Sequence, residues 1–179
     1  MHKSPGTARV HPTACATHTR TIDGMTSGPE PDLAMSQLLH LIREELEMDV
    51  AFVSEFVDGQ RVLRHVDTGP GAEMVVAGLS HPAEDTLCQR VLDGRLPQLV
   101  SDLPALRKTM PLPEMPIAIG AHMSARVQRQ DGRVYGMLCC FSFDPDPRLG
   151  ERHLRRLEMS AKLAGRLLDE AEGTASPMA

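Results

Sequence analysis

The sequence predicts an α+β domain with a central antiparallel sheet and a helix near each end of the chain. Two Asp-Gly dipeptides, at 58–59 and 131–132, each lie between two runs of β-forming residues, an arrangement typical of β-hairpins. Apolar residues spaced three and four apart precede the first hairpin and follow the second, as in amphipathic helices. A chain of 179 residues is long enough for one domain with a substantial core.

The first helix and the first hairpin follow from local patterns. Asp32 is the expected N-cap of the helix, and one helical face carries Met35, Leu38, Leu39, Ile42 and Leu46. Residues 50–57 and 61–67 are expected to pair as antiparallel strands. Asp58-Gly59 between them favours a type I′ turn, because both central residues of that turn need positive φ.

The middle of the chain carries weaker signals. Residues 69–78 predict a loop with a short strand at 73–77, and Pro82 and Asp85 mark the entry to a helix that Gly94 stops after Asp93. Residues 96–100 predict a brief strand. Four prolines at 104, 111, 113 and 116 then predict a long loop without regular structure, either a lid or binding loop or a mobile segment.

The second hairpin and the last helix complete the order of elements. Residues 122–130 and 133–143 flank Asp131-Gly132 and predict the second antiparallel pair. The last helix carries an apolar seam that is expected to pack on another helix and on the sheet, or to form a dimer contact: Leu154, Leu157, Ala161, Ala164 and Leu168. We expect disordered tails at 1–31 and 173–179 and a folded domain at 32–172.

Composition excludes several classes of function. The net charge of −5 disfavours nucleic-acid binding, which needs clustered cations, and no apolar run is long enough for a membrane helix. Eight scattered histidines show no repeated metal-ligand spacing, so no metal site is expected. A reducing cytoplasm is expected because no CxxC pair or disulfide framework links the four cysteines: Cys15, Cys88, Cys139 and Cys140.

Three motifs identify a family resemblance. Cys-Gln-Arg-Val at 88–91, Asp-Gly-Arg-Leu-Pro at 93–97 and Gly-Met-Leu-Cys-Cys-Phe at 136–141 resemble bacterial GAF domains, standalone or of the kind fused to EAL and GGDEF signalling proteins. The resemblance covers about residues 33–171. It implies a GAF/PAS-like antiparallel sheet with the N- and C-terminal helices on one face, and with loops and a short helix on the other.

The resemblance also implies a function and a site. It implies a non-catalytic sensory or regulatory domain of bacterial signal transduction, which binds an unidentified small molecule or partner protein, including a signalling enzyme, and forms a homodimer through its terminal helices. Six residues are candidates for ligand contact: His81, Asp85, Cys88, Met110, Met115 and His122. For Cys88, Met110 and Met115 the alternative interpretation is core packing. For His122 the alternative is a structural role.

Other GAF activities match the sequence less well. The Asn-Lys-x-x-x-Phe signature of cyclic-nucleotide-binding members is absent, and Cys88 is followed by Gln89 instead of the histidine common at bilin-attachment sites. Two alternatives stay open: a free methionine sulfoxide reductase using Cys88, and a dimerisation module without a ligand. Cys139 and Cys140 are adjacent on a predicted strand, so at most one of them can face the ligand. The five aromatic residues are expected to pack across the first and last strands.

Overall fold

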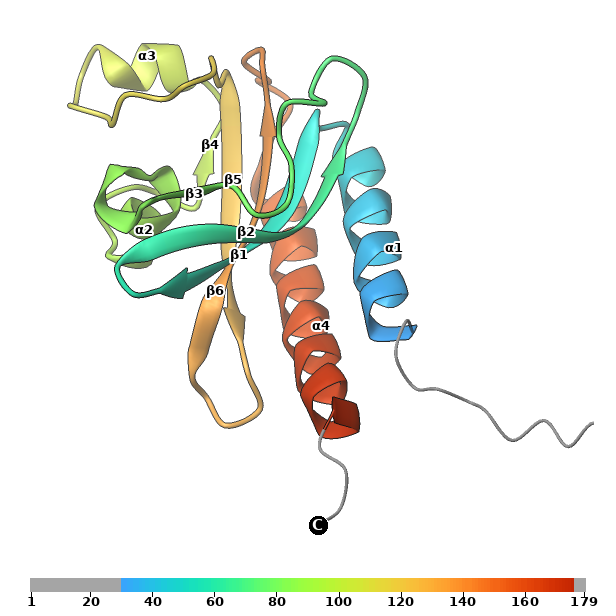
Figure 1. Ribbon diagram of the computed structural model, residues 1–179. Helices are drawn as coiled ribbons and strands as arrows, with labels where there is room; N and C mark the ends of the chain where they lie inside the picture. Colours follow the sequence, from blue (N-terminus) through green and yellow to red (C-terminus); the bar gives the residue numbers. More distant parts are fainter. Residues whose placement is uncertain (1–29, 176–179) are drawn as a thin grey trace, which may run out of the picture.

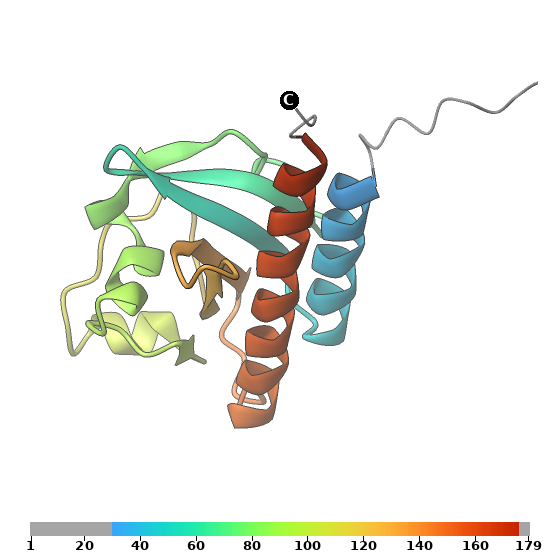
Figure 2. The same cartoon turned by 90° about the horizontal axis from the view of Figure 1, so that it is seen from below.

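The computed structural model describes residues 30–175 and contains one six-stranded antiparallel sheet in the order β3-β2-β1-β6-β5-β4. Helices α1 and α4 lie side by side on one face of this sheet, and α2, α3 and the connecting loops lie on the other (Figures 1 and 2). The elements in chain order are α1 (Glu30–Glu45), β1 (Val50–Val57), β2 (Gln60–Thr68), β3 (Ser80–Pro82), the 3₁₀ turn η1 (Ala83–Asp85), α2 (Leu87–Leu92), β4 (Leu99–Val100), α3 (Leu103–Arg107), β5 (Ala121–Gln128), β6 (Val134–Ser142) and α4 (Glu151–Ala175).

Both predicted hairpins are confirmed, with different turns. Asp58 and Gly59 have φ of 50° and 72°, so the β1–β2 connection is the two-residue turn with positive φ at both positions that Asp-Gly favours. Between β5 and β6, the Arg129 N–H donates to the Arg133 carbonyl around three residues, of which Gly132 alone has positive φ. The second turn is therefore the longer type that ends in a left-handed glycine.

The sheet separates two apolar clusters. One packs between the sheet and the two long helices, and the other lies under α2, α3 and the loops. Cys140 belongs to the helix-side cluster and Cys139 to the loop-side cluster, which confirms that these adjacent cysteines face opposite ways. The cross-strand aromatic packing is confirmed for Phe52 and Phe141, whose rings meet edge to face at 6.4 Å.

Three local predictions are wrong, and a fourth is confirmed only in part. Asp32 is not an N-cap, because α1 already includes Glu30. Residues 73–77 form no strand; β3 lies at Ser80–Pro82 and pairs with β2. The strand predicted at 96–100 shrinks to Leu99–Val100. The proline-bearing segment holds the short helix α3, because proline is tolerated in a first helical turn and the Asp102 carboxylate accepts a hydrogen bond from the Ala105 N–H.

The helix predicted from Pro82 and Asp85 to Asp93 is present in two parts. The 3₁₀ turn η1 comes first, and Thr86 then caps α2, its hydroxyl accepting a hydrogen bond from the Gln89 N–H at 3.2 Å. Gly94 follows with φ 74°, as expected of a residue that ends a helix. At the chain ends, residues 30–31 and 173–175 are helical, and the rest of both predicted tails lies outside the described residues.

Helix α4 packs very closely on the sheet. Leu157, Ala161, Ala164 and Leu168 are buried, so the seam is occupied within one protomer and does not provide a dimer contact. A Cβ placed on Gly165 would lie 2.0 Å from the Gln128 carbonyl oxygen, so the helix backbone almost touches β5 there. None of the helices in the described part of the chain combines the length and apolarity needed to cross a bilayer.

We expect Gly165→Ala to lower the free energy of unfolding by about 2 kcal/mol, because the added methyl group must push α4 away from β5. Urea denaturation followed by circular dichroism measures the change. Gly173→Ala is the matched control in the same helix, where a Cβ meets nothing within 4 Å and alanine favours the helix by up to about 1 kcal/mol. Equal effects of the two substitutions would contradict the close packing.

Candidate functional site

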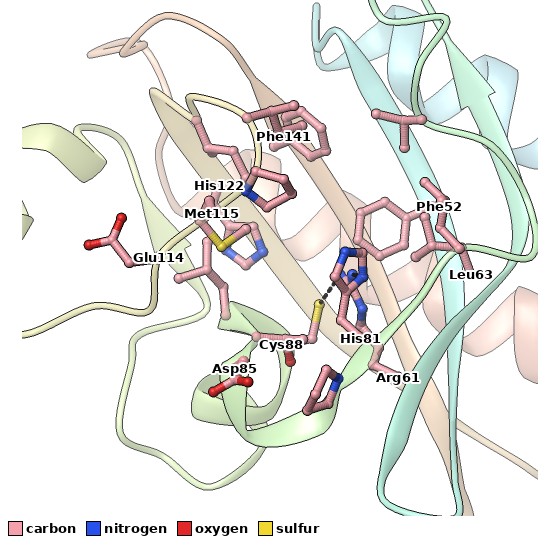
Figure 3. A pocket seen from close by; sticks show the side chains of 18 of the residues that line it. Phe52, Arg61, Leu63, His81, Asp85, Cys88, Glu114, Met115, His122 and Phe141 are labelled. Carbon is pink, nitrogen blue, oxygen red and sulfur yellow. Dashed lines mark hydrogen bonds between the residues drawn. The ribbon is translucent and has the colours of Figure 1, made fainter.

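A cavity of about 460 Å³ lies on the loop-covered face of the sheet (Figure 3). Its floor is formed by strands, with Phe52 from β1, Arg61 and Leu63 from β2, and Phe141 from β6. Its walls come from the stretch between β3 and α2, from residues 114–119 and from the loop that precedes β3. The cavity is therefore a mainly apolar cup that closes only when distant segments of the chain come together.

Five of the six predicted site residues line this cavity: His81, Asp85, Cys88, Met115 and His122. Cys88 and His122 are buried, His81 and Met115 are half-buried, and Asp85 is exposed. Met110 does not line it and instead packs against the loop-side apolar cluster, so for Met110 the core-packing interpretation describes its position. The other five residues line the cavity, where a ligand could reach them, and their contact with a ligand stays a prediction.

Arg61 is the main lining residue that the sequence analysis missed. It is 8% exposed; its Nη2 donates to Nδ1 of His81 at 2.9 Å, and its guanidinium lies 5.5 Å from the centre of the Phe52 ring. Its Nε is buried without a hydrogen-bond partner, and no carboxylate in residues 30–175 forms an ion pair with it. The sequence signal that could have found Arg61 was the alternation of side chains along a strand, because Arg61 and the apolar Leu63 are two positions apart and face the same side of β2.

The positive charge of Arg61 is one of the causes that lower the pKa values of neighbouring side chains. Burial, followed by the nearby Arg61 charge, lowers the pKa of His81, so the imidazole is held neutral and can accept the hydrogen bond from Arg61. Arg61 Nη1 also lies 3.8 Å from the Cys88 sulfur, and Figure 3 shows this contact at the wall of the cavity. The cavity thus combines apolar walls with one buried positive charge, while the two carboxylates in its lining, those of Asp85 and Glu114, are exposed.

Three metal-binding or nucleophilic side chains meet beside this charge. The Cys88 and Cys139 sulfurs are 3.2 Å apart, and both lie within 4.8 Å of a ring nitrogen of His122. Hydrogen bonding with Cys139, then the neighbouring His122 and Arg61, holds the pKa of Cys88 well below its usual range, whereas burial raises that of Cys139. Spacing along the chain gave no sign of this cluster, because its members come from α2, β5 and β6.

Cys140 provides an internal contrast. It lies on the helix side of β6, away from the cavity, and burial raises its pKa to about 12. Cys88, Cys139 and Cys140 are all free thiols, while Cys15 lies outside the described residues. Two of the described cysteines thus share the environment of Arg61, and the third is an inert core residue.

The antiparallel sheet, with two long helices on one face and the cavity on the other, defines the class as a small α+β domain. The family model for the GAF domain matches residues 30–169, and the chain belongs to the GAF family, whose members are commonly sensory or regulatory domains. No protein of curated function matches the sequence.

Solved structures with this fold come from several kinds of protein. The GAF domain of a phosphoenolpyruvate-protein phosphotransferase from Coxiella burnetii has a TM-score of 0.66 at 16% identity, covering 83% of this chain and 88% of that one. The corresponding domain from Acinetobacter has 0.64 at 12%, covering 83% and 87%. A type II free methionine-R-sulfoxide reductase from Thermoplasma acidophilum has 0.59 at 17%, covering 79% and 94%. At these identities the likeness shows the fold alone.

Arg43 and Arg61 are equally buried, but Arg43 has a structural role and Arg61 faces the cavity. Arg43 is also 8% exposed, but its Nε donates to the Asp67 carboxylate at 2.5 Å. We expect Arg43→Met to lower the free energy of unfolding by about 2 kcal/mol, because the Asp67 carboxylate loses its arginine partner. Arg61→Met should stay within about 1 kcal/mol of wild type, because the charge it removes is buried without a carboxylate partner.

Chemical denaturation of the two variants and of wild type measures both changes. Methionine keeps most of the aliphatic volume in each case, so the comparison isolates the charged head. If Arg61→Met lost as much stability as Arg43→Met, Arg61 would be a structural residue of the fold and not a group kept for a ligand.

Proposed function

We propose that this protein is a non-catalytic sensory or regulatory GAF domain of bacterial signal transduction, and that its cavity binds a small molecule with an apolar body and an anionic group. The observation that carries the proposal is Arg61, a buried cation without a carboxylate partner in the described chain, at the floor of an apolar cup. We also assign the protein to the cytoplasm, which its free thiols support.

The charge of Arg61 is the reason for expecting an anion. Its hydrogen bond to His81, its contact with the Phe52 ring and its 3.8 Å contact with the Cys88 sulfur satisfy part of the guanidinium, but no carboxylate in residues 30–175 pairs with it. Removing a charge from water is costly unless an opposite charge compensates it. A carboxylate entering the cavity would accept hydrogen bonds from Arg61 and supply that compensation, while the apolar walls receive the rest of the molecule.

Size supports a ligand of moderate dimensions. The cavity of about 460 Å³ lies within the range of roughly 300 to 1,000 Å³ that is usual for small-molecule sites. Phe52 and Phe141 lie on adjacent strands at its floor and would pack against an aromatic or branched aliphatic body. The half-buried Met115 lies in the wall, and its flexible side chain can adapt to different shapes.

Occupancy would be passed on by a shift between two arrangements of the protein. A ligand that contacts residues 114–119 at the cavity wall would favour one arrangement of the terminal helices, by no more than the difference in its affinity for the two states. We propose that these helices also form a homodimer, through the outer surface of α1 and α4 where Leu41 and Met159 are exposed. A strict monomer by light scattering at high protein concentration would contradict the dimer.

A matched pair of probes tests the anionic ligand. We expect 2-naphthoate to bind at least about tenfold more tightly than 2-naphthalenemethanol, because a hydrogen bond to a charged group contributes about 1.5 to 3 kcal/mol. Isothermal titration calorimetry of the purified protein measures both affinities. Arg61→Met should abolish the preference while leaving the alcohol's affinity nearly unchanged.

The control is Arg64→Met, which removes an exposed arginine of the same strand. That variant should keep the wild-type preference for the carboxylate. Equal binding of acid and alcohol by wild type, or binding of neither probe at millimolar concentration, would contradict the proposal. Native mass spectrometry of protein purified from its own source would then identify the natural ligand directly.

A free methionine sulfoxide reductase is the second candidate, favoured by the 3.2 Å separation of the Cys88 and Cys139 sulfurs. In that reaction the two thiols reduce the sulfoxide to a thioether, and water and a Cys88–Cys139 disulfide form. Asp144 follows the last strand and does not line the cavity, and the carboxylates that do line it, Asp85 and Glu114, come from other segments than the last strands, where that enzyme family places its acidic residues. Sulfoxide turnover by wild type but not by Cys88→Ser would establish this candidate.

A further inference from the structure

Cys88, Cys139 and His122 form a compact donor set that the fold assembles from three separate elements. Antiparallel pairing places His122 opposite Phe141 and Ser124 opposite Cys139, so the imidazole and the Cys139 thiol are diagonal neighbours on the same face of the sheet. Helix α2 crosses this face and brings Cys88 to within 3.2 Å of Cys139. The three donor atoms lie within 4.8 Å of one another, and all three residues are buried.

The histidine in this set has a ring nitrogen without a hydrogen-bond partner. His122 is 2% exposed, and its Nδ1 is buried without a hydrogen-bond partner. A buried polar atom without a partner is destabilising by about 1 to 3 kcal/mol. A ring nitrogen of the same imidazole lies within 4.8 Å of both sulfurs, which are weak hydrogen-bonding partners. An imidazole nitrogen in this setting is suited to a coordinate bond.

We propose that Cys88, Cys139 and His122 bind one thiophilic d¹⁰ cation, Zn²⁺ in the first place and Cu(I) as the competing ion. Two thiolates and one imidazole are the donors that these ions prefer. Tetrahedral Zn²⁺ with bonds of about 2.3 Å to sulfur and about 2.0 Å to nitrogen separates its donors by roughly 3.5 to 3.8 Å. The observed separations, from 3.2 Å to at most 4.8 Å, bracket that value, so small side-chain rotations complete the site.

The charges around the cluster are compatible with this ion. Both thiols lose their protons to solvent as the metal binds, and the two thiolates balance its double positive charge. The Arg61 guanidinium, 3.8 Å from the Cys88 sulfur, therefore faces a neutral centre and stabilises the thiolate that it contacts. With three protein ligands, the ion keeps a fourth position for an exogenous group. Cys88 and His122 line the cavity, so this position is accessible to a cavity ligand.

Zinc titration of the reduced, metal-free protein against a chromophoric chelator tests the site. We expect one equivalent to bind to wild type and to Cys140→Ser, which removes the thiol on the opposite face of β6. Cys88→Ser, Cys139→Ser and His122→Ala should each weaken binding by about 100-fold or more, because substitution of groups that only support a metal ligand already costs 10 to 100-fold. The same titration with Cu(I) ranks the two ions.

Cobalt binding to the wild-type protein provides a second test, which does not depend on whether the core variants fold. Cobalt(II) bound at this site should give an intense sulfur-to-metal charge-transfer absorption in the near ultraviolet, which zinc then abolishes. The proposal is overturned if reduced wild type takes up no zinc, if Cys88→Ser binds as tightly as Cys140→Ser, or if bound cobalt lacks that absorption. A Cys88–Cys139 disulfide that forms in air in a protein without zinc affinity would assign the pair to redox chemistry instead.

The zinc result is independent of the organic ligand. The titration contains no carboxylate probe, so failure to bind zinc leaves the anionic-ligand proposal intact. Conversely, loss of naphthoate preference in Arg61→Met does not remove any of the three metal ligands. Metal binding and sulfoxide reduction would use the same two thiols, so tight zinc retention also argues against the reductase candidate.

Discussion

The pairing of β1 with β6 is the contact on which the rest of the structure depends. It joins the N-terminal hairpin to the C-terminal hairpin over six residue pairs, from Val50–Phe141 to Glu55–Gly136. The two strands approach so closely at their far end that a Cβ on Gly136 would lie 1.7 Å from the Ser54 carbonyl oxygen. Only glycine fits there, and without this pairing neither the two apolar clusters nor the floor of the cavity would form.

Strand β6 connects the structural face of the sheet to the face with the cavity. Leu138 and Cys140 point to the long helices, while Met137, Cys139 and Phe141 point to the other side. Because alternate residues of one rigid strand touch both layers, a change in the cavity acts on the backbone against which α1 and α4 pack. This alternation gives the proposed sensory function a physical route, with no linker between site and helices.

The cavity concentrates polar groups that have incomplete partners in an otherwise apolar setting. Arg61 Nε and His122 Nδ1 are both buried without hydrogen bonds, and the Cys88 and Cys139 thiols rest against each other. A protein core usually satisfies or excludes such groups. Arg43, equally buried but paired with Asp67, shows how the same chain satisfies a cation whose role is structural. The contrast supports the proposal that the groups in the cavity are kept for a ligand.

Local patterns predicted most of the fold, because helices and tight hairpins are governed by neighbours in sequence. The two hairpins, both long helices and the opposite orientations of Cys139 and Cys140 follow from turn chemistry and from periods of 3.6 and 2. The predicted strand at 73–77 failed because an edge strand depends on its partner: the Leu63 backbone bonds to Gly78 and Leu79, which places β3 further along the chain. Helix α3 was missed because its one proline, Pro104, lies where a first turn tolerates it.

The sequence by itself determined that the chain forms this sheet with its helices, and it pointed to five residues of the cavity wall. The tertiary structure alone decided that Arg61 faces the cavity without a carboxylate partner, and that Cys88 meets Cys139 across 51 residues of chain. The physical reason is that such contacts depend on strand register and on the path of α2 over the sheet. A shift of one residue in the register of β2 would turn Arg61 to the opposite face of the sheet, and the same shift in β6 would turn Cys139 away from Cys88.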